Sequence, residues 1–377
     1  MGTNFHFLTN ALLAVVCGLM GTSFLSLHVP KKEGLLNYRI SLNVLASAYF
    51  VLGLLALTVL IFNLSDNSRE FFTYVITAIS SLQALLFTFT LITLINPRYI
   101  KIRYLVYHLI PFLIFTFLFI ISNLIFGNPE IANLTDIPQN FSNPTIWIRL
   151  LFFGFYIFQL IYYSYLFINE AKRYDNELLE YFSEVFQLKM RWVRIAFFAA
   201  LVVGITAMIS YFFPKEYDWI FNLVYAIFYF GFAQEYIKYN RIFSIIEPAI
   251  LVETSEVSTG QSKLRIKTDW SYYKNEVSAH RYYCEVGINI EEMARKLNIG
   301  RTTLSTFINR EEGVNFNTWI NKLRIEEAKH LLIENPDYSI AIISEMVGYT
   351  EQANFSRQFK QITGESPLVW RKKLAAS

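Results

Sequence analysis

Four polar side chains stand inside long apolar runs of the first 240 residues, where any chemistry would be conspicuous: Gln83, Gln159, Asn222 and Tyr225. Their amide and hydroxyl groups can bond to a neighbouring helix, which stabilises helix packing by about 0.6 kcal/mol per contact. They can equally line a pocket for a small molecule. Both interpretations stay open, and the second makes these four residues a candidate small-molecule pocket.

Catalytic and metal-binding signatures are missing from the sequence. No HExxH, no GxSxG and no pair of intramembrane aspartates occurs, so membrane proteases and proton-coupled carriers are not indicated. Cys17 and Cys284 offer neither a disulfide framework nor metal-ligand spacing. We therefore predict that the protein is not an enzyme, with no catalytic, cofactor-binding or metal-binding residue.

The apolar residues are concentrated in one part of the chain. Of the 377 residues 54% are hydrophobic and 17% aromatic, which is too apolar for an ordinary soluble protein. Residues 1–240 carry 28 charged side chains, whereas the shorter stretch 241–377 carries 35. Two physically different parts share one chain, and a net charge of +3 indicates neither a polyanion-coating protein nor an acidic tail.

Seven stretches of the first part are long and apolar enough to cross a bilayer as helices, which takes roughly 20 residues each. Tyr, Trp and Arg residues stand at their ends, as is typical of interfacial anchors. The stretches are residues 7–29, 38–62, 71–95, 104–126, 146–168, 193–213 and 219–239. We predict a seven-helix transmembrane domain over residues 1–240.

The loops between these stretches predict the orientation. Those after the first, third and fifth stretches carry eleven Lys and Arg residues, whereas the alternating loops hold Arg69 and Lys215. Because Lys and Arg are retained in the cytoplasm during insertion, seven crossings place the N-terminus outside and everything after Asn240 inside. Met1–His6 has no cationic side chain ahead of the first apolar run, so we expect a retained helix rather than a signal peptide.

The loop Asn169–Trp192 is charged yet has apolar residues at helical spacing, with five acidic residues before Gln187. We predict a cytoplasmic amphipathic helix there. It is either a solvated extension of the neighbouring membrane helices or a surface on which the cytoplasmic part docks.

Residues 241–268 mix polar residues with little periodicity and are predicted to be a cytoplasmic linker, with a flexible tether at Glu253–Lys263. Helical spacing returns at Trp270 and predicts a helix of about 16 residues. That helix opens the last predicted domain, residues 269–377.

One pattern occurs twice in this domain: helix, short turn, helix. In the first copy Asn289 is predicted to cap a helix, and the Glu292 side chain to bond back to the Asn289 amide. The break Asn298–Gly300 then leads into a helix over Arg301–Arg310. In the second copy Ser339 caps Ile340–Val347, Gly348–Thr350 forms the turn, and Glu351–Thr363 is the next helix.

A helical pattern over Phe316–Glu334 joins the two copies. At 1.5 Å per residue, about 18 residues span on the order of 27 Å. Two helix-turn-helix motifs set that far apart, allowing for their own width, match successive major-groove windows of DNA, about 34 Å apart. One chain could therefore contact two adjacent grooves.

At these residues the chain resembles a known family: residues 287–373 look like the DNA-binding domain of AraC/XylS-type bacterial transcription regulators. The resemblance rests on residues 324–328 (RIEEA), the Gly348–Tyr349 turn, residues 355–360 (FSRQFK) and the spacing of Gly364 and Pro367. It covers 87 of the 377 residues and does not extend to the apolar part. Gly300 and Asn309 depart from the family pattern, and without a capping Ser at 300 the first recognition helix begins more weakly.

The resemblance implies which side chains read DNA bases. Their chemistry suits this task, since Arg can bind guanine, Gln can bind adenine, and Thr and Ala methyl groups can touch thymine. The implied base-reading residues are Arg301, Thr302, Ser305 and Thr306 in the first motif and Gln352, Ala353, Ser356 and Arg357 in the second.

These observations predict an all-α protein, a seven-helix transmembrane bundle followed by a cytoplasmic domain with two helix-turn-helix motifs. The expected function is that of a membrane-integral one-component bacterial transcription regulator in the cell membrane. The alternatives are a receptor or carrier that signals through a protein partner, and a latent factor released by proteolysis of the linker. Expected partners are double-stranded DNA, the lipid bilayer, a second copy of the chain, and a small molecule or membrane protein as signal. Residues 286–377 hold 12 Lys and Arg against 11 Asp and Glu, so we expect weak sequence-independent DNA binding.

Overall fold

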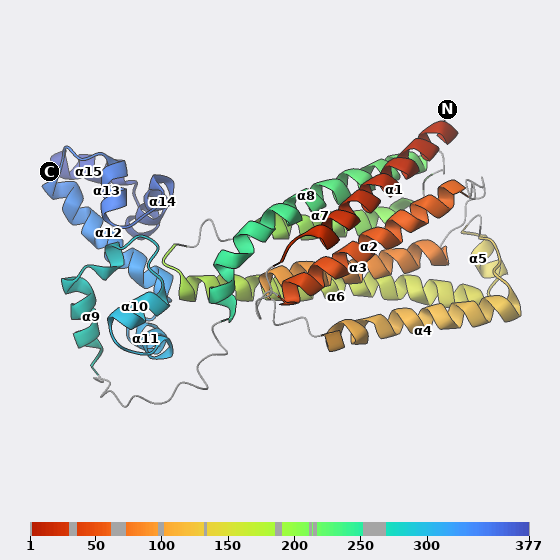
Figure 1. The fold of residues 1–377 in the computed structure, drawn as a ribbon, viewed down its shortest axis with the longest axis horizontal. Coiled ribbons are helices and arrows are strands. Elements are labelled where there is room, and N and C mark those ends of the chain that lie inside the picture. Colours follow the sequence, from red (N-terminus) through yellow and green to blue (C-terminus); the bar gives the residue numbers. More distant parts are fainter. Residues whose placement is uncertain are drawn as a thin grey trace. The chain divides into compact units, whose positions relative to one another are not determined.

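The protein is helical throughout the part that the structure describes. The computed structural model describes residues 2–29, 36–61, 73–96, 102–131, 134–184, 191–210, 213, 217–251 and 269–376, and no strand occurs among them. The chain divides into two compact units, one of residues 1–172 and 190–247, the other of residues 173–189 and 248–377. The predicted all-α class is confirmed, and Figure 1 shows the two sets of helices.

The first unit is a bundle of long helices that run side by side, with one short helix in a connection (Figure 1). Its helices are α1 (Gly2–Ser26), α2 (Leu36–Ile61), α3 (Tyr74–Ile95), α4 (Ile102–Phe126), α5 (Asp136–Gln139), α6 (Pro144–Tyr181), α7 (Arg191–Ile209) and α8 (Asp218–Leu251). Each long helix coincides with one predicted apolar stretch to within a few residues, except that α6 and α8 continue well beyond theirs.

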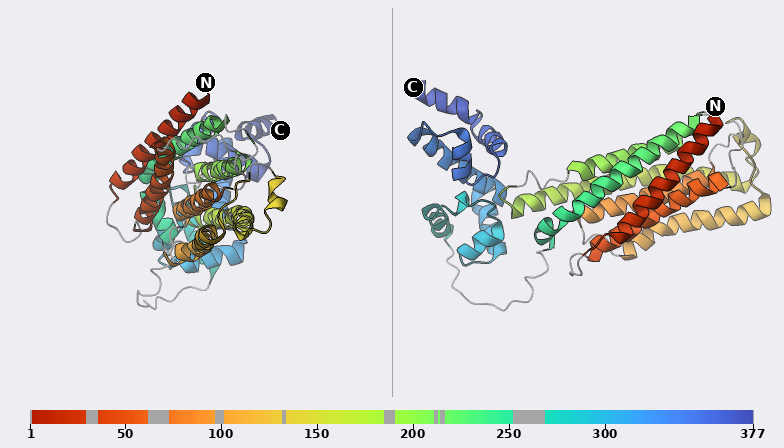
Figure 2. Two further views of the ribbon diagram at one scale, coloured as in Figure 1. Left: turned by 90° about the vertical axis from the view of Figure 1, so that its right-hand side faces the viewer. Right: turned by 45° about the horizontal axis from the view of Figure 1, so that its top comes forward.

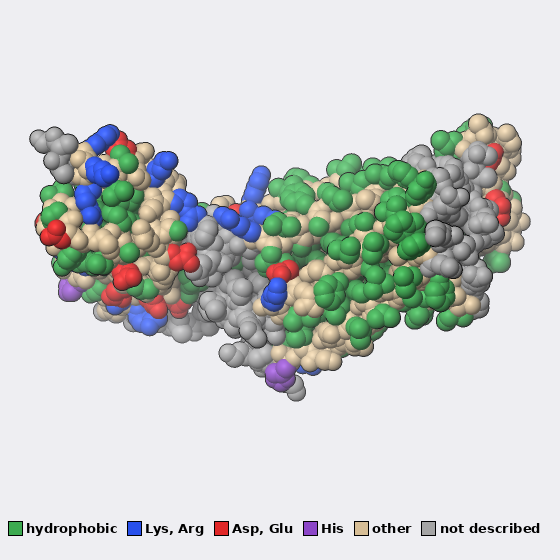
Figure 3. Space-filling model, turned by 90° about the horizontal axis from the view of Figure 1, so that it is seen from above, with side chains coloured by type: hydrophobic (Ala, Val, Ile, Leu, Met, Phe, Trp, Pro, Cys, Tyr) green, Lys and Arg blue, Asp and Glu red, His purple; other side chains and the backbone are tan. Residues whose placement is uncertain are grey.

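Six helices among the described residues are long and apolar enough to cross a membrane: α1, α2, α3, α4, α6 and α7. Much of their apolar surface faces outward. In α4, only 6% of the most apolar 18-residue stretch is buried. Figure 3 shows hydrophobic side chains over most of the visible face of the bundle. An apolar surface of this extent is typical of a protein that contacts lipid.

The seventh predicted crossing falls in α8, which is not among those six helices. Polar side chains such as Asn222, Gln234 and Glu235 interrupt the apolar run of α8. It nevertheless packs along α1 in the same direction, because Phe5 contacts Trp219 near one end (ring centres 5.5 Å apart) and Phe24 contacts Tyr236 near the other (5.8 Å). α8 therefore accompanies α1 over nearly the full length of that apolar helix.

The helix predicted over residues 169–192 is present as far as Tyr181, as an extension of the preceding apolar helix, which was one of the two interpretations left open. α6 continues without a break from Pro144 to Tyr181, a rise of about 57 Å over its 38 residues. The described chain then continues to Glu184 as a non-helical segment, and α7 begins at Arg191. The apolar spacing was interpreted correctly as helical, but nothing local in the sequence marks the point at which the helix stops.

The second unit consists of short helices around one longer helix, α12 (Figure 2). Its helices are α9 (Trp270–Ala279), α10 (Ile290–Lys296), α11 (Arg301–Phe307), α12 (Phe316–Glu334), α13 (Ile340–Met346), α14 (Gln352–Thr363) and α15 (Pro367–Ala376). The last turns of α6 also belong to this unit.

Three predicted boundaries in this region need correction. The helix from Trp270 ends after ten residues, because Arg281 adopts a left-handed backbone (φ 50°) before the short 3-10 turn Tyr282–Cys284. The first recognition helix gives way after Phe307 to a wider turn, Ile308–Glu312. Residues 241–251 of the predicted linker continue α8, and the predicted tether lies outside the described residues.

α12 belongs to two separate hydrophobic cores. Phe316, Trp319 and Ile320 in its first half pack with α9, α10 and α11. Ile325, Leu331 and Leu332 in its second half pack with α13 and α14. The two helix-turn-helix motifs are therefore two small subdomains, each with its own hydrophobic core, joined by α12.

Arg324 lies between these two cores and is completely buried. Its Nε donates to the carbonyl of Tyr283 (2.6 Å) and its Nη2 to that of Glu285 (2.9 Å), both in the first subdomain. Its guanidinium also lies over the ring of Tyr349 in the second subdomain, 5.1 Å from the ring centre. One side chain therefore connects the two subdomains.

Gly348 makes room for this connection. It has a φ of +90°, and a Cβ there would lie 2.4 Å from the carbonyl oxygen of Cys284 and 3.1 Å from Nη2 of Arg324. Gly313 provides a matched comparison, since it also has a positive φ of +66° but opens onto empty space.

We expect Gly348→Ala to cost about 2–4 kcal/mol of unfolding free energy, from left-handed backbone strain plus overpacking. Gly313→Ala should cost roughly 1 kcal/mol, from backbone strain alone. Thermal unfolding of the full chain in detergent, followed by tryptophan fluorescence, checks both variants. Equal losses would show that the close approach of Cys284 and Arg324 to Gly348 does not matter.

Candidate nucleic-acid interface

The first helix-turn-helix motif is built by local signals at both ends of α10. The Asn289 side chain accepts from the Glu292 amide (3.0 Å), and the Glu292 carboxylate accepts from the Asn289 amide (3.3 Å), as predicted. Met293 and Leu297 are buried beneath α10. Gly300 precedes α11 and, lacking a side chain, provides no cap, so the weaker start of the first recognition helix stays a prediction.

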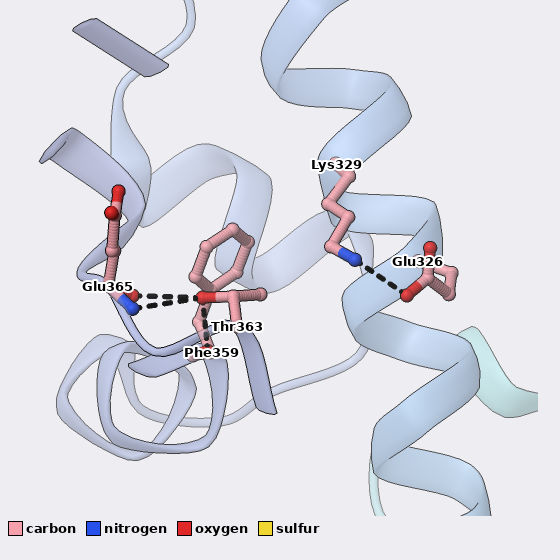
Figure 4. A network of polar contacts seen from close by, with 5 residues as sticks. All are labelled: Glu326, Lys329, Phe359, Thr363 and Glu365. Atoms are coloured by element: carbon pink, nitrogen blue, oxygen red, sulfur yellow. Dashed lines mark hydrogen bonds and ion pairs between the residues drawn. The ribbon is translucent and has the colours of Figure 1, made fainter. Parts of the chain in front are cut away.

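The second motif begins with Ser339, whose hydroxyl accepts from the Ile342 amide (3.2 Å) as predicted. α14 starts at Gln352, and its N-cap Glu351 makes no side-chain capping bond. At the other end of α14 the Thr363 hydroxyl donates to the carbonyls of Phe359 (2.8 Å) and Glu365 (3.0 Å) (Figure 4). The second recognition helix therefore has a side-chain hydrogen bond at its C-terminal end and no side-chain cap from Glu351 at its start.

The predicted base-reading side chains lie on accessible faces of α11 and α14. Thr302 and Thr306 on α11 are exposed, and so are Gln352, Ala353 and Arg357 on α14. The other three, Arg301, Ser305 and Ser356, are half-buried. Exposure at the start of each recognition helix is what contact with base edges requires.

Two of these side chains already have partners from the end of α6. The guanidinium of Arg301 lies 5.3 Å from the centre of the Tyr181 ring. The Ser305 hydroxyl lies 3.4 Å from a carboxylate oxygen of Glu180. On α14, Arg357 bonds to Asn354 (3.4 Å).

Two polar residues near the start of α14 were not among the predicted site residues. Thr350 and Asn354 stand at the start of α14, and both donate hydrogen bonds to the carboxylate of Glu184. A Thr in the turn before a recognition helix is a recognisable signal for anion binding. The burial of Asn354, by contrast, depends on packing that the sequence does not reveal.

The bundle of the first unit contains a partly open cavity of about 300 Å³. Gln83, Asn222 and Tyr225 line it, as does Tyr229 on the same face of α8. Asn10 and Tyr156 also line it and were not predicted. Gln159 is not among the lining residues but bonds to Ser81 (2.6 Å), which is the interhelical role. Gln83 donates to the Ala48 carbonyl (2.8 Å), while its own Oε1 is buried and has no hydrogen-bond partner among the described residues.

Two helix-turn-helix motifs on a shared helix define a class of DNA-binding domain, and similarity to known proteins agrees. Residues 293–373 match a family described as a helix-turn-helix domain. This domain is of the AraC/XylS type, so the resemblance is confirmed.

The similar proteins are bacterial regulators. The Msm operon regulatory protein of Streptococcus mutans is 33% identical over 104 residues, which are 27% of this chain and 37% of that protein. The raffinose operon transcriptional regulatory protein of Pediococcus pentosaceus is 33% identical over 88 residues (23% and 31%). The arabinose operon regulatory protein of Escherichia coli is 30% identical over 90 residues (24% and 30%). The chain thus spans about a third of the length of these relatives.

Arg357→Ala tests base reading directly. If the exposed guanidinium binds a guanine, the variant should lose about 1–3 kcal/mol at one base pair and relax preference there. The measurement uses purified full-length protein and a duplex selected from a random pool, together with its single-base variants. Arg310→Ala is the control, since Arg310 is an exposed arginine outside the predicted base-reading set. If Arg357→Ala instead weakens binding equally on all duplexes, as an ordinary surface arginine such as Arg310 could, then Arg357 contacts phosphate and not a base.

Proposed function

We propose that this protein is a membrane-integral one-component transcription regulator, in which a helical bundle senses a signal and a cytoplasmic domain binds specific DNA. The observation that carries this proposal is that one chain contains both parts. A bundle with outward-facing apolar helices is covalently joined to an AraC/XylS-type helix-turn-helix domain. No second protein is then needed to pass a signal from membrane to DNA.

DNA binding is supported by the spacing of the two motifs. α12 has 19 residues, a rise of about 28 Å at 1.5 Å per residue. Both recognition helices present polar side chains at their starts, which suits insertion into successive major grooves. The relatives are named as regulators of operons, and we extend that role to this chain.

Placement in the membrane is supported by the exposed surface of α4. Large apolar side chains face outward along its length, including Leu113, Phe117, Ile120 and Leu124, of which Leu124 is 80% exposed. In water such a surface would promote aggregation, whereas in a bilayer it is the stable arrangement. α8 accompanies α1 in the same direction, which supports a seventh crossing from outside to inside.

The cavity supports a sensing role for the bundle. Its lining is mainly apolar with a few polar groups, which fits a small amphiphilic molecule. Hydrogen-bonding side chains such as Asn222 and Tyr225 in this lining suit a ligand that carries a hydroxyl or amine group. We propose Gln83, Asn222 and Tyr225 as signal-contacting residues, and Gln159 as a packing residue of the same bundle.

A second copy of the chain is a further expected partner. The near balance of charge in residues 286–377 gives little sequence-independent attraction to phosphate. Two domains held at one membrane surface would bind two adjacent sites at high effective concentration.

The proposed function is tested by chromatin immunoprecipitation combined with immunoblots of membrane and soluble fractions. Enriched promoter sites with an intact, membrane-bound chain are expected. A soluble C-terminal fragment would favour release by proteolysis, and absence of any enriched site would favour signalling through a protein partner.

Topology provides a separate prediction. Reporter fusions after Lys101 and after Asn240 should both report a cytoplasmic location, because positive loops are retained inside. Fusions within residues 127–145, a stretch without Lys or Arg, serve as the outside control. A periplasmic result after Asn240 would show that the C-terminal domain lies outside the cytoplasm. It would contradict both the seventh crossing by α8 and the proposal that the domain binds DNA.

A further inference from the structure

The segment Glu180–Glu184, at the end of α6, lies within the second unit and contacts both helix-turn-helix motifs. Its backbone is held by the first half of α12. The Asn317 side chain donates to the carbonyls of Phe182 (3.1 Å) and Ser183 (2.7 Å), and Asn321 donates to Ser183 as well (3.3 Å). Ser183 is 1% exposed, so the segment is inserted rather than resting on the surface.

The segment also pairs with the start of the first motif. Phe182 forms an antiparallel bridge with Asn289, and the Ser183 amide donates to the Ile288 carbonyl (3.4 Å). Tyr181 is 4% exposed and belongs to the first hydrophobic core, and its hydroxyl donates to the Glu291 carboxylate (2.7 Å). An aromatic side chain in the core is a firm anchor.

Glu184 binds the start of the second recognition helix. Its carboxylate accepts from the Thr350 amide (3.3 Å), from the Thr350 hydroxyl (3.0 Å) and from the Asn354 side chain (3.0 Å). An anion held by a backbone amide and a hydroxyl next to a helix N-terminus occupies the kind of site that binds phosphate. In helix-turn-helix complexes such donors position the protein on the DNA backbone.

Glu180 binds the first recognition helix in a similar way. Its carboxylate lies 3.4 Å from the Ser305 hydroxyl and attracts the charge of Arg301. Arg301 also lies over the Tyr181 ring. Two of the four proposed base-reading residues of the first motif are therefore engaged by this segment.

We propose that Glu180–Glu184 is an internal competitor of DNA, a segment whose carboxylates occupy on both motifs the donors that DNA would use. This inference rests on the proposed function, since it takes these donors to be DNA contacts. Each donor can satisfy one anion at a time, so the docked segment and a duplex exclude one another. The docked state is the state of low DNA affinity, and displacement of the end of α6 frees both motifs together.

The binding test compares the double variant Glu180→Ala/Glu184→Ala with the wild-type full chain in nanodiscs. The probe is a duplex selected from a random pool with the double variant. We expect the double variant to bind at least about tenfold more tightly, because competition is lost. Glu177→Ala is the matched control: Glu177 is an acidic residue of the same helix that pairs with Arg173 (2.9 Å). Equal or weaker binding by the double variant, or an equal gain in the control, would overturn the competition.

A crosslinking test observes docking without relying on affinity. Glu184→Cys and Thr350→Cys, joined by a short thiol-specific crosslinker in the full chain, should link efficiently without DNA and poorly in saturating DNA. The pair Glu177→Cys and Thr350→Cys is the control. Absence of the link without DNA, or a link unchanged by bound DNA, would refute the proposal. If the crosslink forms but neither the wild type nor any variant binds a duplex, the proposed DNA-binding function is wrong. The competition with DNA is then wrong as well, although the docking of the segment is real.

Discussion

The buried guanidinium of Arg324 is the interaction on which the arrangement of the second unit depends. Removing an ionised group from water is costly unless hydrogen bonds and an attractive environment compensate. Burial lowers the pKa of Arg324, yet the carbonyls of Tyr283 and Glu285 and the face of Tyr349 stabilise its charged form. Because these partners come from both subdomains, the same interaction that stabilises the charge sets the distance between the two recognition helices.

The segment Glu180–Glu184, called the docking segment, contacts the DNA-binding domain next to Arg324. Asn321, one turn before Arg324 on α12, accepts from the Tyr349 hydroxyl (2.6 Å) and donates to the Ser183 carbonyl (3.3 Å). Tyr349 thus contacts both Arg324 and Asn321. Binding of the segment and the relative placement of the two motifs share these side chains, so a change in one is expected to be felt by the other.

The sequence predicted those features that depend on neighbours in the chain. The capping pair Asn289 and Glu292, the cap Ser339 and the bounds of α12 are local, and all were predicted. Arg324 belonged to the family motif, but its burial could not be foreseen because its partners lie about 40 residues away. The end of α6 was missed for the same reason, since Phe182 leaves the helix to pair with Asn289. The roles of the eight base-reading residues remain predictions.

α6 provides the physical route from signal to DNA under the proposed function. Tyr156, Leu160 and Tyr163 on this helix line the cavity, and Glu180 on the same helix contacts Ser305. The 18 residues from Tyr163 to Glu180 belong to one uninterrupted helix, and the two ends lie about 26 Å apart along it. Under the proposed function, a ligand at Tyr163 therefore binds the same continuous helix that carries Glu180. Suppose that the end of α6 is either docked on the DNA-binding domain or displaced from it. A ligand that binds one of these two states more tightly than the other would shift the balance between the docked and the DNA-bound domain.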